Sequence, residues 1–149
     1  MCGSEGLINI LAILPSPEDR AALKAIARQS GWSLGIAEAL RPARPLIDKQ
    51  PAGVVLCDCR LPDGGWQDAL RELQQRRLEP LLIVVSRLAD EGLWAEVLNL
   101  GGYDVLATPL EPREVNKSVR LAWQHWQNKL AREKRGGKVI AAGSRGWWP

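Results

Sequence analysis

One carboxylate and two hydroxyls stand at the ends of three separate apolar runs. Asp58 ends the run V-V-L-C-D, Ser86 follows L-L-I-V-V, and Thr108 follows D-V-L-A and precedes Pro109. Each run has the length and composition of a buried strand. An exposed carboxylate at such a place can act as a nucleophile, and hydroxyls beside it can donate hydrogen bonds to the group that it attacks.

The elements that must position these side chains alternate along the chain. Apolar runs predict strands at 7–14, 32–37, 54–58, 81–85 and 103–107. Helical patterns predict helices at about 17–29, 66–77, 90–100 and 111–134, and a short, late-starting one within 38–50, because Pro42 and Pro45 interrupt that stretch. This alternation predicts a doubly wound α/β domain, with a five-stranded parallel sheet and five helices. Ligands of such sheets bind beyond the carboxyl ends of the strands, where all three polar residues are expected.

Three segments resemble the receiver domain of bacterial two-component response regulators, which has a flavodoxin-like fold. V-V-L-C-D-C-R-L-P-D-G-G resembles the family's phosphoacceptor segment, with Asp58 as the acceptor. L-L-I-V-V-S places Ser86 at the hydroxyl position that contacts the phosphoryl group, and G-G-Y-D-V-L-A-T-P-L resembles the last strand, with Thr108 at the usual lysine position. The resemblance covers roughly residues 7–127. It predicts a receiver domain at 7–135, followed by a flexible tail at 136–149.

The resemblance also implies Mg²⁺, which the family holds with an acidic pair after the first strand. Leu14 and Pro15 stand near that position and cannot ligate a metal. Asp58, with a backbone carbonyl near Arg60, would hold Mg²⁺ weakly at best. Replacing the family's lysine by Thr108 removes a charge-assisted contact worth about 1.5–3 kcal/mol.

Four further charged residues lie near the crevice in sequence. Glu18 and Asp19 are interpreted as helix-start residues, which the helix dipole favours. Arg60 and Arg87 are interpreted as solvated loop side chains. The alternative for this arginine pair is that it replaces some of the missing positive charge.

Two functions remain open. The first is a phosphorelay response regulator whose Asp58 accepts a phosphoryl group from a sensor histidine kinase or a phosphotransfer protein, and which then switches a partner or dimer surface. The alternative is a phosphate-independent pseudo-receiver that acts as a dimerisation or interaction scaffold. In both, a homodimer would form through the fourth helix, fifth strand and fifth helix, with Trp94 and Trp123 as anchors if exposed. Enzymatic activity beyond self-phosphorylation is not expected, nor is direct DNA binding, because little chain follows the last helix.

Composition sets wider limits. Net charge is +3, which is too small to indicate nucleic acid binding, and the basic stretch 129–138 is interpreted as a solvated helix end. The apolar run at 7–15 is too short to cross a membrane, and no basic segment precedes it, so we expect a cytoplasmic protein. Cys57 and Cys59, two apart on a strand, are expected to be reduced and to face the same side.

Two other kinds of site are not expected. His125 is the single histidine and lies on a predicted exposed helix, far from Ser86, so it cannot complete a hydrolase triad. The tail G-G-K-V-I-A-A-G-S-R-G resembles the start of ParA-like ATPases. It lacks the Gly-Lys-Ser/Thr of a phosphate loop, so nucleotide binding is not expected.

Overall fold

A computed structural model describes residues 7–49 and 52–139, with side chains as far as residue 135. The strands are β1 (Asn9–Ile13), β2 (Ser33–Ala37), β3 (Val54–Asp58), β4 (Arg60–Leu61), β5 (Gly64–Gly65), β6 (Leu81–Ser86) and β7 (Asp104–Ala107). The helices are α2 (Pro17–Ser30), α3 (Leu40–Lys49), α4 (Trp66–Gln74), α5 (Glu91–Leu100) and α6 (Pro112–Val139). The last part of the expected tail, from 140 on, lies outside the described residues.

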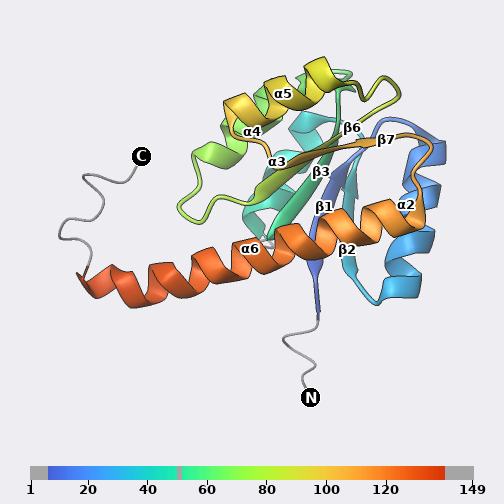
Figure 1. Cartoon of the computed structure of the whole chain (residues 1–149). Helices are drawn as coiled ribbons and strands as arrows, with labels where there is room; N and C mark the ends of the chain where they lie inside the picture. The colour runs from blue at the N-terminus through green and yellow to red at the C-terminus, as the bar shows by residue number, and fades with distance from the viewer. Residues whose placement is uncertain (1–6, 50–51, 140–149) are drawn as a thin grey trace.

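Five strands form one parallel sheet in the order β2-β1-β3-β6-β7, with helices on both faces (Figure 1). The order reverses between β1 and β3, as in doubly wound sheets that bind ligands at this point. The doubly wound fold predicted from sequence is therefore confirmed. The turn expected after β3 contains, in addition, a two-stranded antiparallel ladder of β4 and β5.

The side chains of each strand alternate between two apolar layers. Ala12, Leu56 and Ile83 pack in a layer with α2 and α6, whereas Ile13 and Val84 pack in a layer with α3, α4 and α5. Alternation follows from the period of two along a strand. Because both faces are covered, the central strands β3 and β6 are apolar until their last residue, which leaves Asp58 and Ser86 at the carboxyl ends.

The first helix follows its sequence signals. Ser16 caps α2 by accepting a hydrogen bond from the Asp19 N–H (3.4 Å), and Pro17 occupies the first helical position. Gly31 ends the helix in the left-handed conformation with φ of 75°. Glycine is favoured there because a Cβ would strain this backbone.

The second helix, α3, starts earlier than its prolines predict. It begins at Leu40 and includes both Pro42 and Pro45. The Asp63 carboxylate, from the β4–β5 turn, accepts hydrogen bonds from the Leu40 and Arg41 N–H groups at 2.9 Å each. This cap from a distant loop satisfies the first turn, and Pro42 lacks only an N–H that needs no helical partner there.

The last helix, α6, runs beyond the sheet (Figure 1). Its residues Val115, Val119, Ala122 and Trp126 are buried against the sheet, as the spacing predicts. The helix ends at Val139 rather than near 134, so the first residues of the predicted tail are helical. Extending an established helix costs far less than starting one. No helix in the described part of the chain is long and apolar enough to cross a membrane.

Candidate functional site

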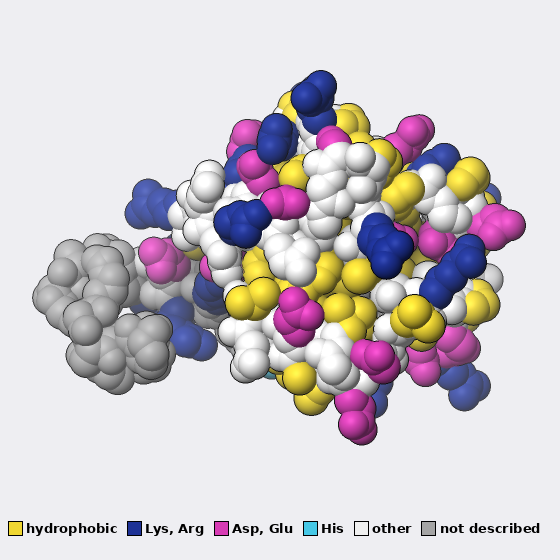
Figure 2. Space-filling view, turned by 90° about the horizontal axis from the view of Figure 1, so that it is seen from above, with side chains coloured by type: hydrophobic (Ala, Val, Ile, Leu, Met, Phe, Trp, Pro, Cys, Tyr) yellow, Lys and Arg dark blue, Asp and Glu magenta, His cyan; other side chains and the backbone are white. Residues whose placement is uncertain are grey.

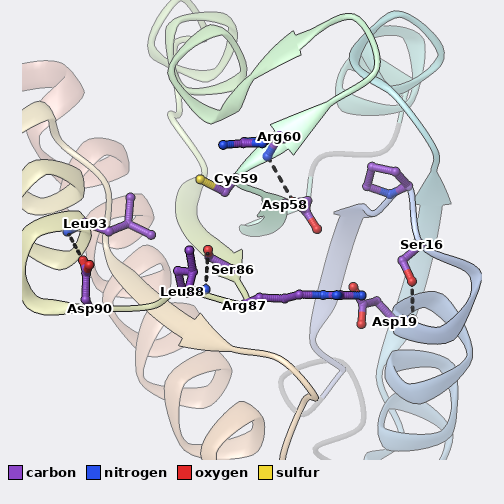
Figure 3. A pocket seen from close by; sticks show the side chains of 11 residues that line it. Ser16, Asp19, Asp58, Cys59, Arg60, Ser86, Arg87, Leu88, Asp90 and Leu93 are labelled. Carbon is purple, nitrogen blue, oxygen red and sulfur yellow. Dashed lines mark hydrogen bonds between the residues drawn. The ribbon is translucent and has the colours of Figure 1, made fainter.

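An open crevice of about 640 Å³ lies at the carboxyl ends of the central strands. Figure 2 looks onto this end of the molecule, where acidic and basic side chains surround a central area of exposed apolar groups. The crevice is lined by Pro15, Ser16, Asp19, Asp58, Cys59, Arg60, Ser86, Arg87, Leu88, Asp90 and Leu93 (Figure 3). Two of the three predicted site residues, Asp58 and Ser86, therefore meet in one crevice.

Asp58 is the last residue of β3 and is half-buried. Its Oδ1 accepts a hydrogen bond from the Arg60 N–H at 3.0 Å, which orients the carboxylate within the crevice (Figure 3). The next residue is fixed as well, because the Cys59 N–H donates to the Val85 carbonyl at 2.8 Å. Backbone contacts thus hold a strand-end carboxylate facing open space, the geometry that a carboxylate nucleophile needs.

Ser86 is the last residue of β6, on the strand that pairs with β3. Its Oγ accepts a hydrogen bond from the Leu88 N–H at 3.1 Å. Cys59 also lines the crevice; burial raises the pKa of its thiol, while a hydrogen bond with Ser86 opposes this shift. Cys57 and Cys59 pack in the same apolar layer, as predicted. The thiols are therefore neutral neighbours of the site.

Thr108, the third predicted site residue, does not line the crevice. Its N–H donates to the Ser86 carbonyl at 3.1 Å, and a cis peptide bond joins it to Pro109. It contacts the end of β6 through its backbone. Thr108 therefore lies next to Ser86 through its backbone. Its side chain is not part of the crevice lining.

The end of β1 is closed to a metal ion. The Leu14 side chain is fully buried, and the carbonyls of Leu14 and Pro15 accept hydrogen bonds from one Arg20 guanidinium nitrogen at 2.9 and 2.8 Å. No group of three or more His, Cys, Asp or Glu side chains suited to a metal occurs within 7–49 and 52–139. These residues do not fit a magnesium site built on an acidic pair after β1.

Asp19 reaches the crevice from the first turn of α2, although the sequence interpretation treated it as a helix-start residue. It fulfils that role too, since its N–H donates to Ser16. Partial burial and the nearby Asp58 carboxylate raise the pKa of the Asp19 carboxyl, and the Arg87 guanidinium opposes this shift. The sequence signal was its place three residues after the cap, in the helix turn nearest the strand ends.

The two crevice arginines differ in direction. The Arg60 side chain leads away from Asp58, whereas the Arg87 side chain extends across the crevice toward Asp19 (Figure 3). His125 lies elsewhere, exposed on α6 and edge-on to Tyr103 with 5.4 Å between ring centroids. The crevice lining therefore contains three carboxylates, two hydroxyls and two arginines, and of the arginines only Arg87 points inward.

The family model and the curated relatives that match this chain point to the same protein family. The sequence matches the response regulator receiver domain over residues 10–120. It is 27% identical over 125 residues to the TorCAD operon transcriptional regulatory protein TorR of Escherichia coli O157:H7, covering 84% of this chain and 53% of that protein. The chain spans about half, or less, of the length of the curated relatives that it matches.

Solved structures agree on the fold. A CheY-like response regulator receiver domain protein from Methanospirillum hungatei gives a TM-score of 0.69 at 22% identity, covering 83% of this chain and 98% of that one. The receiver domain of the Pseudomonas aeruginosa sensor histidine kinase PA1611, described with a magnesium ion coordinated in the active site cleft, gives 0.68 at 24%, covering 78% and 96%. At these identities the likeness concerns the fold.

Proposed function

Because the chain belongs to the response regulator receiver domain family, we propose that it accepts a phosphoryl group on Asp58. Receiver domains are signalling modules of two-component systems rather than enzymes with a released product. The observation that carries the proposal is the Asp58 carboxylate, held by the Arg60 N–H in an open crevice beside the Ser86 hydroxyl. We also propose that Ser86 is the hydroxyl that contacts the phosphoryl group and that Thr108 occupies the usual lysine position.

The reaction needs few protein groups. A carboxylate oxygen of Asp58 attacks the phosphorus of a donor such as a phosphohistidine or acetyl phosphate. A new P–O bond forms, the bond from phosphorus to the leaving group breaks, and the leaving group departs with the electron pair. The Ser86 hydroxyl is placed to donate a hydrogen bond to a phosphoryl oxygen, which stabilises the added negative charge.

Magnesium enters this chemistry in the family, where it neutralises charge on the phosphoryl oxygens. In this chain Leu14 and Pro15 stand near the expected place of that acidic pair, the Leu14 side chain is buried, and Arg20 binds the carbonyls of both residues. Asp58 and a carbonyl near Arg60 would provide too few ligands for tight binding. The proposed transfer therefore relies on the side chains of this chain and not on a tightly bound metal ion.

The signalling output is proposed to pass through the surface of α5, β7 and α6. Trp94 on α5 is 49% exposed and Leu98 38% exposed, and Trp94 borders a shallow hollow with Val105 of β7. Trp123, the other candidate anchor, is buried and is excluded as a contact. A sensor histidine kinase or a phosphotransfer protein is the proposed donor.

The exposed Trp94 also favours the alternative function, a phosphate-independent scaffold that dimerises through the same surface. Light scattering of the chain with and without a phosphodonor separates the two functions. A scaffold associates equally in both conditions, whereas a switch changes its association when the donor is present.

The direct test is phosphorylation by acetyl phosphate, with the intact protein weighed by mass spectrometry in media with and without Mg²⁺. We expect the mass of one phosphoryl group in the wild type and none in Asp58→Asn. Asp90→Asn, a carboxylate on the same crevice that caps α5, is the matched control and should still gain the group. Equal labelling of wild type and Asp58→Asn, or no labelling in either medium, would refute the proposal.

A further inference from the structure

One residue of the crevice lining, Arg87, carries a positive charge and points into the crevice. Arg87 directly follows Ser86, and its side chain extends over the crevice toward Asp19 (Figure 3). Asp19 and Asp58 both line this crevice, on the side that Arg87 approaches. A side chain anchored at the end of β6 therefore brings a permanent positive charge toward Asp19, in a crevice that Asp58 also lines.

Electrostatics support this position. Burial and the Asp58 charge raise the pKa of the Asp19 carboxyl, whereas the Arg87 charge lowers it, so both neighbouring charges act on Asp19. Arg87 is exposed and forms no ion pair within 4.0 Å in the described part of the chain. Its guanidinium is consequently free to move toward whichever anion in the crevice carries more charge.

A second arginine makes the β1 end positive. The Arg20 guanidinium donates to the Leu14 and Pro15 carbonyls at 2.9 and 2.8 Å. A divalent cation approaching Asp19 and Asp58 would thus meet positive charge from both Arg20 and Arg87. Coulomb repulsion at these ranges opposes metal binding, even though two carboxylates are present.

We propose that the Arg87 guanidinium is the built-in cation of the phosphoacceptor site, shared by Asp19 and Asp58 before transfer and drawn to the phosphoryl group afterwards, so that transfer needs no divalent metal. This rests on the proposed phosphorylation of Asp58. A guanidinium suits the role, because it is always charged and its planar N–H fork matches two phosphoryl oxygens at once.

The proposal also gives Asp19 a role as a positioning residue. Before transfer, its carboxylate attracts Arg87 across the crevice without a direct ion pair. After transfer, the phosphoryl group on Asp58 carries more negative charge than the carboxylate it replaced and competes for the guanidinium. Asp19 then loses its cation at the start of α2, next to the Ser16 cap.

The test compares wild type, Arg87→Gln and Arg28→Gln. Arg28→Gln is the matched control, since it removes the same charge from an exposed side chain in the last turn of α2 that does not line the crevice. With acetyl phosphate, the wild type should be labelled at rates within about twofold in EDTA and in Mg²⁺. In EDTA, Arg87→Gln should be slowed about tenfold to a hundredfold, the size of a lost charge-assisted contact, and Arg28→Gln less than about threefold.

A second arm does not depend on phosphorylation. In an isothermal Mg²⁺ titration, Arg87→Gln should bind the ion about tenfold more tightly than the wild type, because the repelling charge is gone and Asp19 and Asp58 remain. Arg28→Gln, outside the crevice, should bind Mg²⁺ as the wild type does.

The outcomes separate the two proposals. Labelling of the wild type that requires Mg²⁺, or equal labelling of Arg87→Gln and wild type in EDTA, would overturn the role of Arg87 while leaving phosphorylation of Asp58 intact. No labelling in any medium would overturn the proposed function. In that case the titration still decides whether Arg87 occupies the cation position, and an unchanged Mg²⁺ affinity in Arg87→Gln would refute it.

Discussion

The middle of the sheet and the crevice at its carboxyl ends are built from the same strands but obey different constraints. In the middle, every strand residue packs between helices, so that Val55, Leu56 and Val84 have no measurable exposure. At the ends, Asp58 and Ser86 are half-exposed and each is held by one or two hydrogen bonds. Packing distributes stability over many contacts, whereas the crevice depends on a few specific groups.

The difference explains how a chain can keep a family's fold while changing its site. At the β1 end Leu14 is fully buried and extends the apolar core to the rim of the crevice. A leucine at such a border adds packing but offers no ligand to a metal ion. Core contacts therefore preserve the architecture, and the electrostatics of the crevice can be rebuilt around other residues.

The largest effect expected in this comparison comes from the core. Trp66, at the start of α4, is 2% exposed, and Trp66→Ala should lower the free energy of unfolding by about 3–5 kcal/mol. Urea denaturation measures this change. The matched control is Trp94→Ala, whose indole is 49% exposed and should cost much less. Equal losses in the two variants would contradict the assigned difference in packing.

A smaller loss of stability is expected from a substitution at Gly53, which directly precedes β3. A Cβ at Gly53 would lie 2.7 Å from two ring atoms of Trp126 and 2.8 Å from Trp123, and the two indoles pack against each other. Rigid rings cannot move aside, so Gly53→Ala should cost about 1–3 kcal/mol through overpacking.

Gly35→Ala provides the control for that substitution. A Cβ at Gly35, in β2, would meet only Leu11 Cδ1 at 3.5 Å, an ordinary contact distance. We expect a stability change within about 0.5 kcal/mol in this variant. A loss at Gly35 as large as that at Gly53 would contradict the assignment of the Gly53 cost to the indole rings.

The core was also the part that the sequence predicts best. Continuous apolar runs mark the strands, and the helical spacing of Val115, Val119 and Ala122 marks the buried face of α6. Local signals predicted the ends of α2 as well, because Ser16 and Gly31 act through the neighbouring backbone alone. Patterns repeated over several residues tolerate exceptions, which makes them reliable.

What the sequence did not predict depends on contacts between distant segments. The early start of α3 depends on Asp63, which caps Leu40 and Arg41 from more than twenty positions away. The approach of Arg87 to Asp19 likewise brings the end of β6 toward the start of α2. Single charged side chains carry no periodic signal, so their sequence positions alone could not distinguish a crevice residue from a solvated one.

The smallest effect concerns the charges of the crevice. Asp58→Asn removes the neighbouring negative charge that raises the pKa of Asp19, so that pKa should fall in the variant. A titration of the Asp19 carboxyl carbon by NMR measures the change. Asp90→Asn is the control, since Asp90 caps α5 and should leave the titration of Asp19 unaltered.

The sign for stability follows from the same shift. A raised pKa means that folded Asp19 holds its proton to higher pH than the unfolded chain, whose carboxyl titrates near 3.8. The ionised Asp19 therefore opposes folding at neutral pH, and this penalty disappears as the pH falls through the raised pKa. In Asp58→Asn, the free energy of unfolding should therefore change less with pH in this range. A penalty of the same size in the variant would mean that burial alone, and not the pair of carboxylates, sets the charge balance of the crevice.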